Sequence, residues 1–128
     1  MIVLDTHVWL WWVSEPSNLS KPAVREITNA DVIGISAISC FEIATAVAKG
    51  RISLDRGTLD WLEQTLALPR VEVLPLTPRI AVKATQLGKE FHGDPADRLI
   101  VATAILEDAV LVTKDTLIRN YSALPTVW

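Results

Sequence analysis

Short apolar runs alternate with longer stretches along the chain, and the short runs have the composition of β-strands. They are rich in Val, Ile and Leu and fall at residues 2–4, 32–35, 71–74 and 110–112. As a group they lack a regular alternation of polar and apolar positions. We therefore expect strands that are buried on both faces, as in a parallel sheet. Residues 126–128 are a further candidate strand.

The longer stretches between these runs carry helical signals. We predict helices over residues 6–13, 22–29, 39–49, 59–66, 78–90 and 95–107, and a short helix after Asp115. Thr77-Pro78 and Asp94-Pro95 each have the composition of an N-cap followed by a first turn.

Regular alternation of strands with helices indicates an α/β fold with right-handed crossovers. We predict a three-layer α/β/α arrangement around a central, mostly parallel sheet of four to five short strands. No linker, internal repeat or low-complexity segment interrupts the 128 residues, so we expect one domain over residues 1–128.

Four carboxylates stand at the ends of apolar segments or inside them, namely Asp5, Glu42, Asp97 and Asp115. A lone charge in such surroundings is costly to desolvate. Ligands of open parallel sheets bind beyond the carboxyl ends of the strands, and the predicted elements bring all four acids to that edge. A divalent cation is the simplest counter-charge that the four acids could share.

Each acid also has an ordinary structural explanation. Asp5 and Asp115 are candidate N-caps of the helices that follow them, and Asp94 is the cap before Pro95. Asp97 then falls at the third helical position, where an acid favours the helix dipole. Glu42 is different, because it lies past the first turn of a helix that is apolar nearly all round and is therefore expected to be buried. No Lys or Arg stands three or four positions from it.

Composition narrows the function classes. The formal net charge is -3, which argues against a protein that holds nucleic acid by bulk positive charge. No apolar run approaches the roughly 18 residues of a membrane-spanning helix, and the N-terminus lacks the basic start of a signal peptide. Cys40 is the single cysteine, which excludes an internal disulfide and agrees with cytoplasmic residence.

Hydrophobic residues make up 50% of the chain, which indicates either a doubly covered sheet or apolar surface reserved for a partner. Trp9, Trp11 and Trp12 crowd one short helix. Trp9 and Trp12 share a face and Trp11 points elsewhere. We expect at least one of them at an interface, with core packing as the alternative.

Four short motifs give the chain a resemblance to a known family. They are Val3-Leu4-Asp5-Thr6, Phe41-Glu42-Ile43-Ala44, His92-Gly93-Asp94-Pro95-Ala96-Asp97-Arg98 and Leu111-Val112-Thr113-Lys114-Asp115. In this order and at this spacing the sequence resembles the PIN-domain ribonucleases, in particular the VapC-like toxins of bacterial toxin–antitoxin pairs. The resemblance extends over nearly the whole chain. It implies a PIN fold, an acidic pocket for Mg²⁺ or Mn²⁺, cleavage of RNA, a homodimer and a cognate antitoxin.

The resemblance places the four metal-binding and catalytic acids of the family on Asp5, Glu42, Asp97 and Asp115. Asp94 precedes the third acid by one helical turn, and its role as a metal ligand or only as a cap stays open. We expect hydrolysis by an activated water, leaving 5′-phosphate and 3′-hydroxyl ends. Candidate substrate contacts are Thr6, Lys49, Arg51, Arg98, Thr113 and Lys114. His92 is expected in a loop near the site.

Two alternatives remain open at this point. A receiver-type signalling domain is also an α/β domain of similar length with an acidic Mg²⁺ site. It carries paired acids after its first strand, however, whereas Asp5 stands alone. The second alternative is a PIN module that binds without catalysis, and the presence of all four acids argues against it.

Overall fold

The computed structural model describes residues 1–91 and 93–128, and this part of the chain contains one five-stranded sheet in which all neighbouring strands are parallel. The strands lie in the order β3-β2-β1-β4-β5. Their bounds are β1 (Ile2–Leu4), β2 (Ile33–Ser36), β3 (Val71–Leu74), β4 (Val110–Val112) and β5 (Thr126–Val127). The predicted parallel sheet is therefore confirmed, with β2 shifted by one residue from its expected position.

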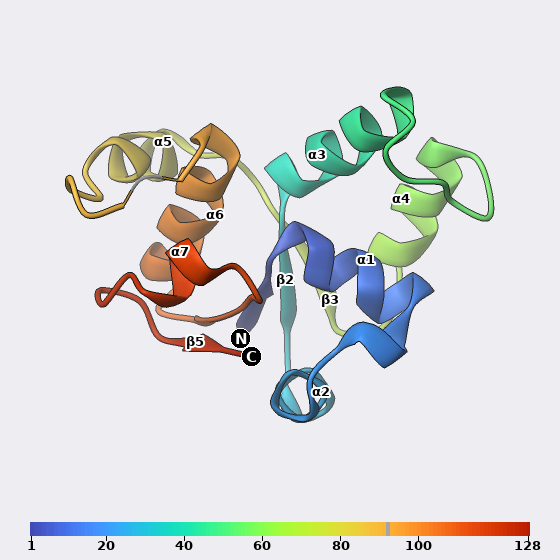
Figure 1. Ribbon diagram of the computed structural model, residues 1–128, viewed down its shortest axis with the longest axis horizontal. Helices are drawn as coiled ribbons and strands as arrows, with labels where there is room; N and C mark the ends of the chain where they lie inside the picture. Colours follow the sequence, from blue (N-terminus) through green and yellow to red (C-terminus); the bar gives the residue numbers. More distant parts are fainter. Residues whose placement is uncertain (92) are drawn as a thin grey trace.

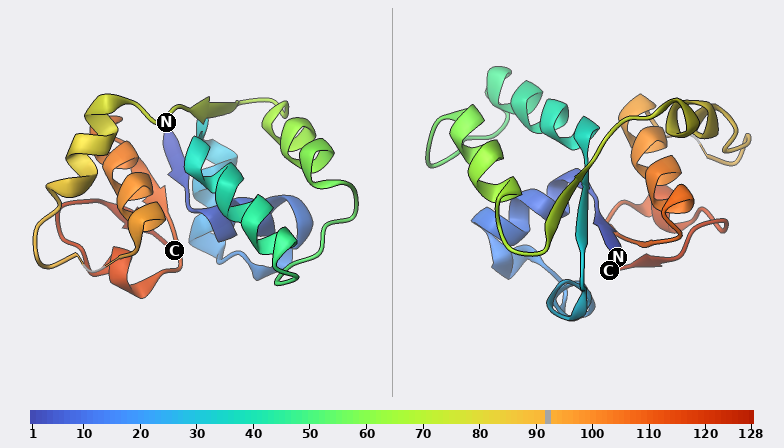
Figure 2. Two further views of the ribbon diagram at one scale, coloured as in Figure 1. Left: turned by 90° about the horizontal axis from the view of Figure 1, so that it is seen from above. Right: turned by 180° about the vertical axis from the view of Figure 1, so that it is seen from behind.

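Helices cover both faces of the sheet (Figure 1). Within the described ranges they are α1 (Thr6–Ser14), the 3₁₀ turn η1 (Pro16–Asn18), α2 (Lys21–Asn29), α3 (Ala37–Ala48), α4 (Thr58–Leu66), α5 (Pro78–Thr85), α6 (Pro95–Leu106) and α7 (Thr116–Arg119). α5, α6 and α7 lie on one side of the sheet, and α1, α3 and α4 lie on the other; the views in Figure 2 show the same division. The three-layer α/β/α prediction is confirmed.

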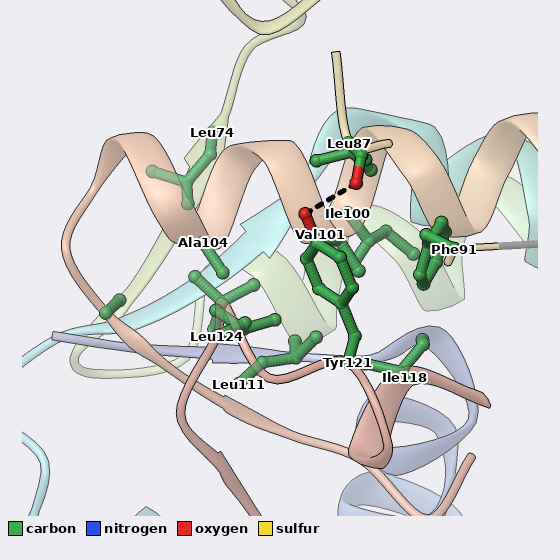
Figure 3. Packing of buried hydrophobic residues seen from close by; sticks show 12 residues of the cluster. Leu74, Leu87, Phe91, Ile100, Val101, Ala104, Leu111, Ile118, Tyr121 and Leu124 are labelled. Carbon is green, nitrogen blue, oxygen red and sulfur yellow. Dashed lines mark hydrogen bonds between the residues drawn. The ribbon is translucent and has the colours of Figure 1, made fainter. Parts of the chain in front are cut away.

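Two apolar clusters fill the space between the sheet and its helices. Alternate residues of β1 divide between them, because Val3 packs with α6 and α7 whereas Ile2 and Leu4 pack with α1 and α2. Figure 3 shows the first cluster, in which the buried Tyr121 hydroxyl donates to the Leu87 carbonyl at 2.8 Å. A sheet covered on both sides explains much of the high apolar content of the chain.

The predicted helix caps are present. Thr77 accepts from the backbone N–H of Ile80, and Asp94 accepts from that of Asp97. Ser20 caps α2 in the same way, accepting from the N–H of Ala23. Each cap satisfies a backbone donor that has no partner within its own helix.

The helix predicted over residues 78–90 ends early, at Thr85. Gly88 has a φ of +89°, a left-handed conformation that is incompatible with a helix continuing to residue 90. The chain then turns inward and buries Leu87 and Phe91. Their carbonyl groups are bound by side chains, the Leu87 carbonyl by Tyr121 and the Phe91 carbonyl by Arg98 at 2.8 Å. Tertiary packing therefore replaces the last turns of the predicted helix.

The expectation that the helix carrying Glu42 is buried is wrong. α3 buries only Ser39 and Ile43, and Phe41 is 68% exposed. The apolar character of α3 therefore does not arise from burial on all sides within this chain.

The tryptophans of α1 separate as expected. Trp9 is fully buried, with its ring centroid 5.2 Å from that of Trp61, and Trp12 packs against the same cluster. Trp11 faces elsewhere and lies 5.8 Å from Trp128, centroid to centroid. No helix in residues 1–91 and 93–128 is both long and apolar enough to cross a membrane.

Candidate active site

A cavity of about 550 Å³ opens at the carboxyl ends of the central strands. In the sheet, Leu4 of β1 is in register with Ile35 of β2 and Val112 of β4, so these three strands end at the same level. The residues that follow them therefore meet at one edge. The acids that line the cavity are Asp5, Glu42, Asp94, Asp97 and Asp115. The structure thus brings together all four predicted acids and the ambiguous fifth.

Asp5 is held in place from both sides. It is 3% exposed, and its Oδ1 accepts from the Thr6 N–H at 2.8 Å. Its Oδ2 accepts from the buried Thr113 hydroxyl at 2.6 Å. The same hydroxyl accepts from the backbone N–H of Asp115 at 3.0 Å. Thr113 therefore fixes the first acid relative to the fourth, across two neighbouring strands.

Glu42 lies in the second turn of α3 and is half-buried. Its Oε1 accepts a hydrogen bond from the Thr6 hydroxyl, which also lies 2.8 Å from the Ser39 hydroxyl. Burial raises the pKa of Glu42, the hydrogen bond from Thr6 opposes that shift, and the charges of Asp5 and Asp94 add to it. A cation beside Glu42 would favour its ionised form.

The pKa of Asp97 reflects the charges of the whole cavity. Burial raises its pKa first, and the negative charges of the four other acids raise it further, to about 7. The ordinary pKa of an aspartate side chain is 3.8. The five acids therefore lie close enough to repel one another, and bound positive charge would relieve that repulsion.

Two of the acids that line this cavity are also helix caps. Asp94 caps α6 through the N–H of Asp97 at 2.9 Å, and Asp115 caps α7 through the N–H of Ile118 at 3.1 Å. Each of these hydrogen bonds uses a single carboxylate oxygen. The second oxygen of each acid accepts no hydrogen bond from the described residues.

The donor set suits a hard divalent cation, because every candidate ligand is a carboxylate oxygen. Within the described residues none of the five acids forms an ion pair with Lys or Arg, and the nearest basic group is His7 Nδ1, 3.6 Å from Asp5 Oδ2. In the same residues no three His, Cys, Asp or Glu side chains are grouped tightly enough to hold an ion. The residue types fit a cation, but their present spacing does not. Binding therefore requires side chains of the cavity to rotate toward one another.

The predicted substrate contacts lie in different places. Thr6 and Arg51 line the cavity, and Lys114 borders a hollow beside it. Thr113 is fully buried, so it positions Asp5 rather than contacting the solvent. Lys49 is exposed just past the end of α3 and is not among the residues that line the cavity.

Arg98 has a structural role. Its guanidinium donates to the carbonyls of Phe91 and Ala84 and lies over the Phe91 ring. It supports the segment before α6 and does not line the cavity. The prediction for His92 lies outside the described residues.

Sequence reasoning missed the apolar wall of the cavity. Ile38, Phe41 and Ala46 line it from α3 beside Glu42, and Leu10 lines it from α1. Helical spacing could have predicted this wall, because residues three or four positions from Glu42 lie on the same, cavity-facing side of α3. The cavity can therefore contact both charged and apolar parts of a ligand.

Comparisons with known proteins agree with this geometry. A sequence model of the family described as PIN domain matches residues 2–124. Ribonuclease VapC22 of Mycobacterium tuberculosis is 43% identical over 120 residues, covering 94% of this chain and 91% of that protein.

Solved structures share the fold. The crystal structure of VapBC2 from Rickettsia felis, bound to a promoter DNA fragment, contains a chain that superimposes with a TM-score of 0.74 at 20% identity, over 99% of this chain and 98% of that one. A toxin–antitoxin complex from Klebsiella pneumoniae gives a TM-score of 0.67 at 20% identity, over 100% and 97%. With a family match over nearly its whole length and its acids gathered at the carboxyl edge of the sheet, the chain belongs to the PIN-domain family.

Proposed function

We propose that this protein is a metal-dependent endoribonuclease that acts as the toxin of a toxin–antitoxin pair. The observation that carries the proposal is the cavity in which five carboxylates converge without a Lys or Arg ion pair among the described residues. The likeness to Ribonuclease VapC22 supports the activity. Membership of the PIN family leaves the receiver-domain alternative without support, and we treat residues 1–128 as one PIN-like domain.

The acids have distinct tasks in this proposal. Asp5, Glu42 and Asp97 hold one Mg²⁺ or Mn²⁺, and Asp115 completes that site or a second one. A bound divalent cation supplies an activated water and stabilises the leaving oxygen. Thr113 and Thr6 keep Asp5 and Glu42 oriented through the hydrogen bonds described above. Asp94 keeps α6 capped so that Asp97 faces the cavity.

Substrate contacts come from groups at the edge of the cavity. Arg51 lines it from the segment after α3 and provides a cation for an RNA phosphate. Phe41 presents an exposed ring at the same cavity, and such rings stack on unpaired bases. The chain is acidic overall, so these local groups matter more than bulk charge.

Partners are part of the same proposal. We expect a homodimer and a cognate antitoxin in the cytoplasm. Exposed apolar side chains on the described surface support the presence of partners, among them Phe41, Val73, Leu76, Val82 and Leu106. Light scattering at micromolar concentration checks the dimer, and a clean monomer would remove that part of the proposal.

A cleavage assay tests the activity. Mixed RNA is incubated with the purified protein and Mg²⁺ or Mn²⁺, with EDTA as the control and the Asp97→Asn variant in parallel. We expect cleavage only by the unsubstituted protein with metal, and products with 5′-phosphate ends. Products ending in a cyclic 2′,3′-phosphate would exclude hydrolysis by an activated water. Binding of RNA without any cleavage would support the non-catalytic module instead.

A further inference from the structure

Two further hollows lie beyond the acid cavity, and each shares lining residues with the hollow before it. His7 and Asp115 line both the cavity and a second hollow that also contains Trp11 and Lys114. Thr116 links this second hollow to a third, between α7 and β5. α7 and β5 lie beside one another at the C-terminal end of the chain (Figure 1). The second hollow therefore borders both the acid cavity and the third hollow.

Aromatic rings and cations lie along this path. The Trp11 ring is half-buried, with its centroid 5.0 Å from the His7 ring and 5.8 Å from the Trp128 ring. Lys114 Nζ lies 5.7 Å from the centroid of Trp11. The third hollow is lined by Trp128 and Arg119, and no described side-chain carboxylate lines it. We call Trp11, Lys114, Arg119 and Trp128 the aromatic track.

The chemistry of the aromatic track favours a single-stranded nucleic acid. Partly exposed rings stack on unpaired bases in a way that tolerates any sequence, and neighbouring cations contact the phosphates. A groove for an apolar peptide would be lined mainly by aliphatic side chains, whereas the third hollow is lined largely by polar groups such as Asn120 and Thr126. Because the net charge is -3, RNA binding depends on local cations rather than on bulk positive charge.

We infer that the aromatic track holds the single-stranded RNA that extends from the scissile phosphate in the acid cavity. Bases flanking the cleaved bond stack on Trp11 and Trp128, and Lys114 and Arg119 contact the phosphates between them. This inference rests on the proposed ribonuclease function. It adds a substrate form, because a duplex, whose bases are paired and stacked, cannot use the rings.

Binding measurements test the track separately from cleavage. All variants are made in the Asp97→Asn background, so that RNA stays intact. A labelled single-stranded RNA of about twelve nucleotides, within the site sizes of single-strand binders, is titrated at several salt concentrations and followed by anisotropy. Trp128→Ala and Arg119→Gln are the test variants. Arg79→Gln, an exposed cation in α5, is the matched control.

We expect Trp128→Ala to weaken binding about tenfold, the loss typical of one stacked base. Arg119→Gln should weaken binding and lower the slope of log affinity against log salt by about 0.7, as expected for one lost phosphate contact on a single strand. Arg79→Gln should change neither quantity. A duplex of the same sequence should bind more weakly than the single strand.

Unchanged affinity and salt slope in both test variants would overturn the track, and so would equal binding of the duplex. Unfolding of each variant is followed by circular dichroism, and the salt slope of Arg119→Gln remains informative even if Trp128→Ala is destabilised. Cleavage of the same RNA by the unsubstituted protein is measured in parallel. If that RNA is cut but the variants bind normally, the track fails and the ribonuclease function stands.

Discussion

Asp97 shows at the scale of one residue what the cavity requires. Its pKa of about 7 results from burial and from the charges of four neighbouring acids. Near neutral pH the protein therefore holds a proton that competes with any cation at the same oxygens. The sequence placed Asp97 at the third position of a helix, but only the folded chain shows that four other carboxylates surround it.

Removing the charge of Asp97 should stabilise the metal-free protein at high pH. Its pKa is about 7 in the folded state and near 3.8 when unfolded, so the folded state binds more protons between these values. The contribution of Asp97 to stability is thus complete below pH 4 and lost as the pH rises through 7. Because the side chain is partly exposed, we expect Asp97→Asn to raise the free energy of unfolding at pH 8 by only about 1 kcal/mol. Urea unfolding in EDTA at pH 5 and pH 8 measures it; equal or lower stability of the variant at pH 8 would contradict the repulsion.

Thr113→Val should damage the site more than a comparable change elsewhere. The substitution removes the donor to Asp5 Oδ2 and the acceptor of the Asp115 N–H, with little change of shape. We expect a loss of about 1–3 kcal/mol in the free energy of unfolding, together with at least a tenfold drop in RNA cleavage, about 1.4 kcal/mol. Thr103→Val is the matched control, because Thr103 is equally buried but donates only to the Leu99 carbonyl within α6. Equal cleavage by both variants would show that Thr113 does not position the acids.

At the scale of elements, the sequence predicted the strands and the helix starts that depend on local interactions. β1, β3 and β4 and the starts of α1 and α5 have the predicted bounds, because each depends on apolar runs and caps a few residues long. The end of α5 depends on contacts from distant segments, and the exposure of Phe41 depends on which face of α3 the rest of the chain covers. Asp5, Asp97 and Asp115 were predicted because each follows a strand or opens a helix, and Glu42 was predicted because it is a lone charge in an apolar stretch. The apolar wall beside Glu42 had no such signal, only a helical spacing of apolar residues.

Two substitutions of Asp94 distinguish its role as a helix cap from the effect of its charge. Asn is as good an N-cap as Asp, so Asp94→Asn should keep the stability of the protein, whereas Asp94→Ala should lose about 1 kcal/mol. Both variants remove a charge that raises the pKa of Asp97. Chemical denaturation measures the free energy of unfolding of the two variants. If Asp94→Asn is as destabilised as Asp94→Ala, the cap is not the structural role of Asp94.

At the scale of the whole molecule, the sheet gathers the acids into one place, where the cation they are proposed to hold would let an acidic chain bind an acidic substrate. Strands β1, β2 and β4 end at one level, so acids that are more than 100 residues apart in sequence reach one cavity. The sequence predicted this edge from the general behaviour of parallel sheets. It did not predict the neighbouring hollows lined by Trp11 and Trp128, because no local pattern links α1 with the C-terminal segment.

Cation binding should depend on pH across neutrality. Protons compete for Asp97 below about pH 7, so Mn²⁺ should bind more tightly at pH 8 than at pH 6. Isothermal titration calorimetry at the two pH values measures the difference, and Glu42→Gln should weaken binding at both. Affinity that is independent of pH in the unsubstituted protein would indicate that the cation binds away from Asp97.

The central claim is that the convergent carboxylates form a cation site, and a crystal grown with Mn²⁺ tests it most directly. Anomalous diffraction locates the ion without reference to activity. The account predicts a strong anomalous peak inside the cavity, bound by oxygens of Asp5, Glu42 or Asp97. A fully ordered cavity without a peak, its acids still bound only to Thr6, Thr113 and backbone N–H groups, would contradict it.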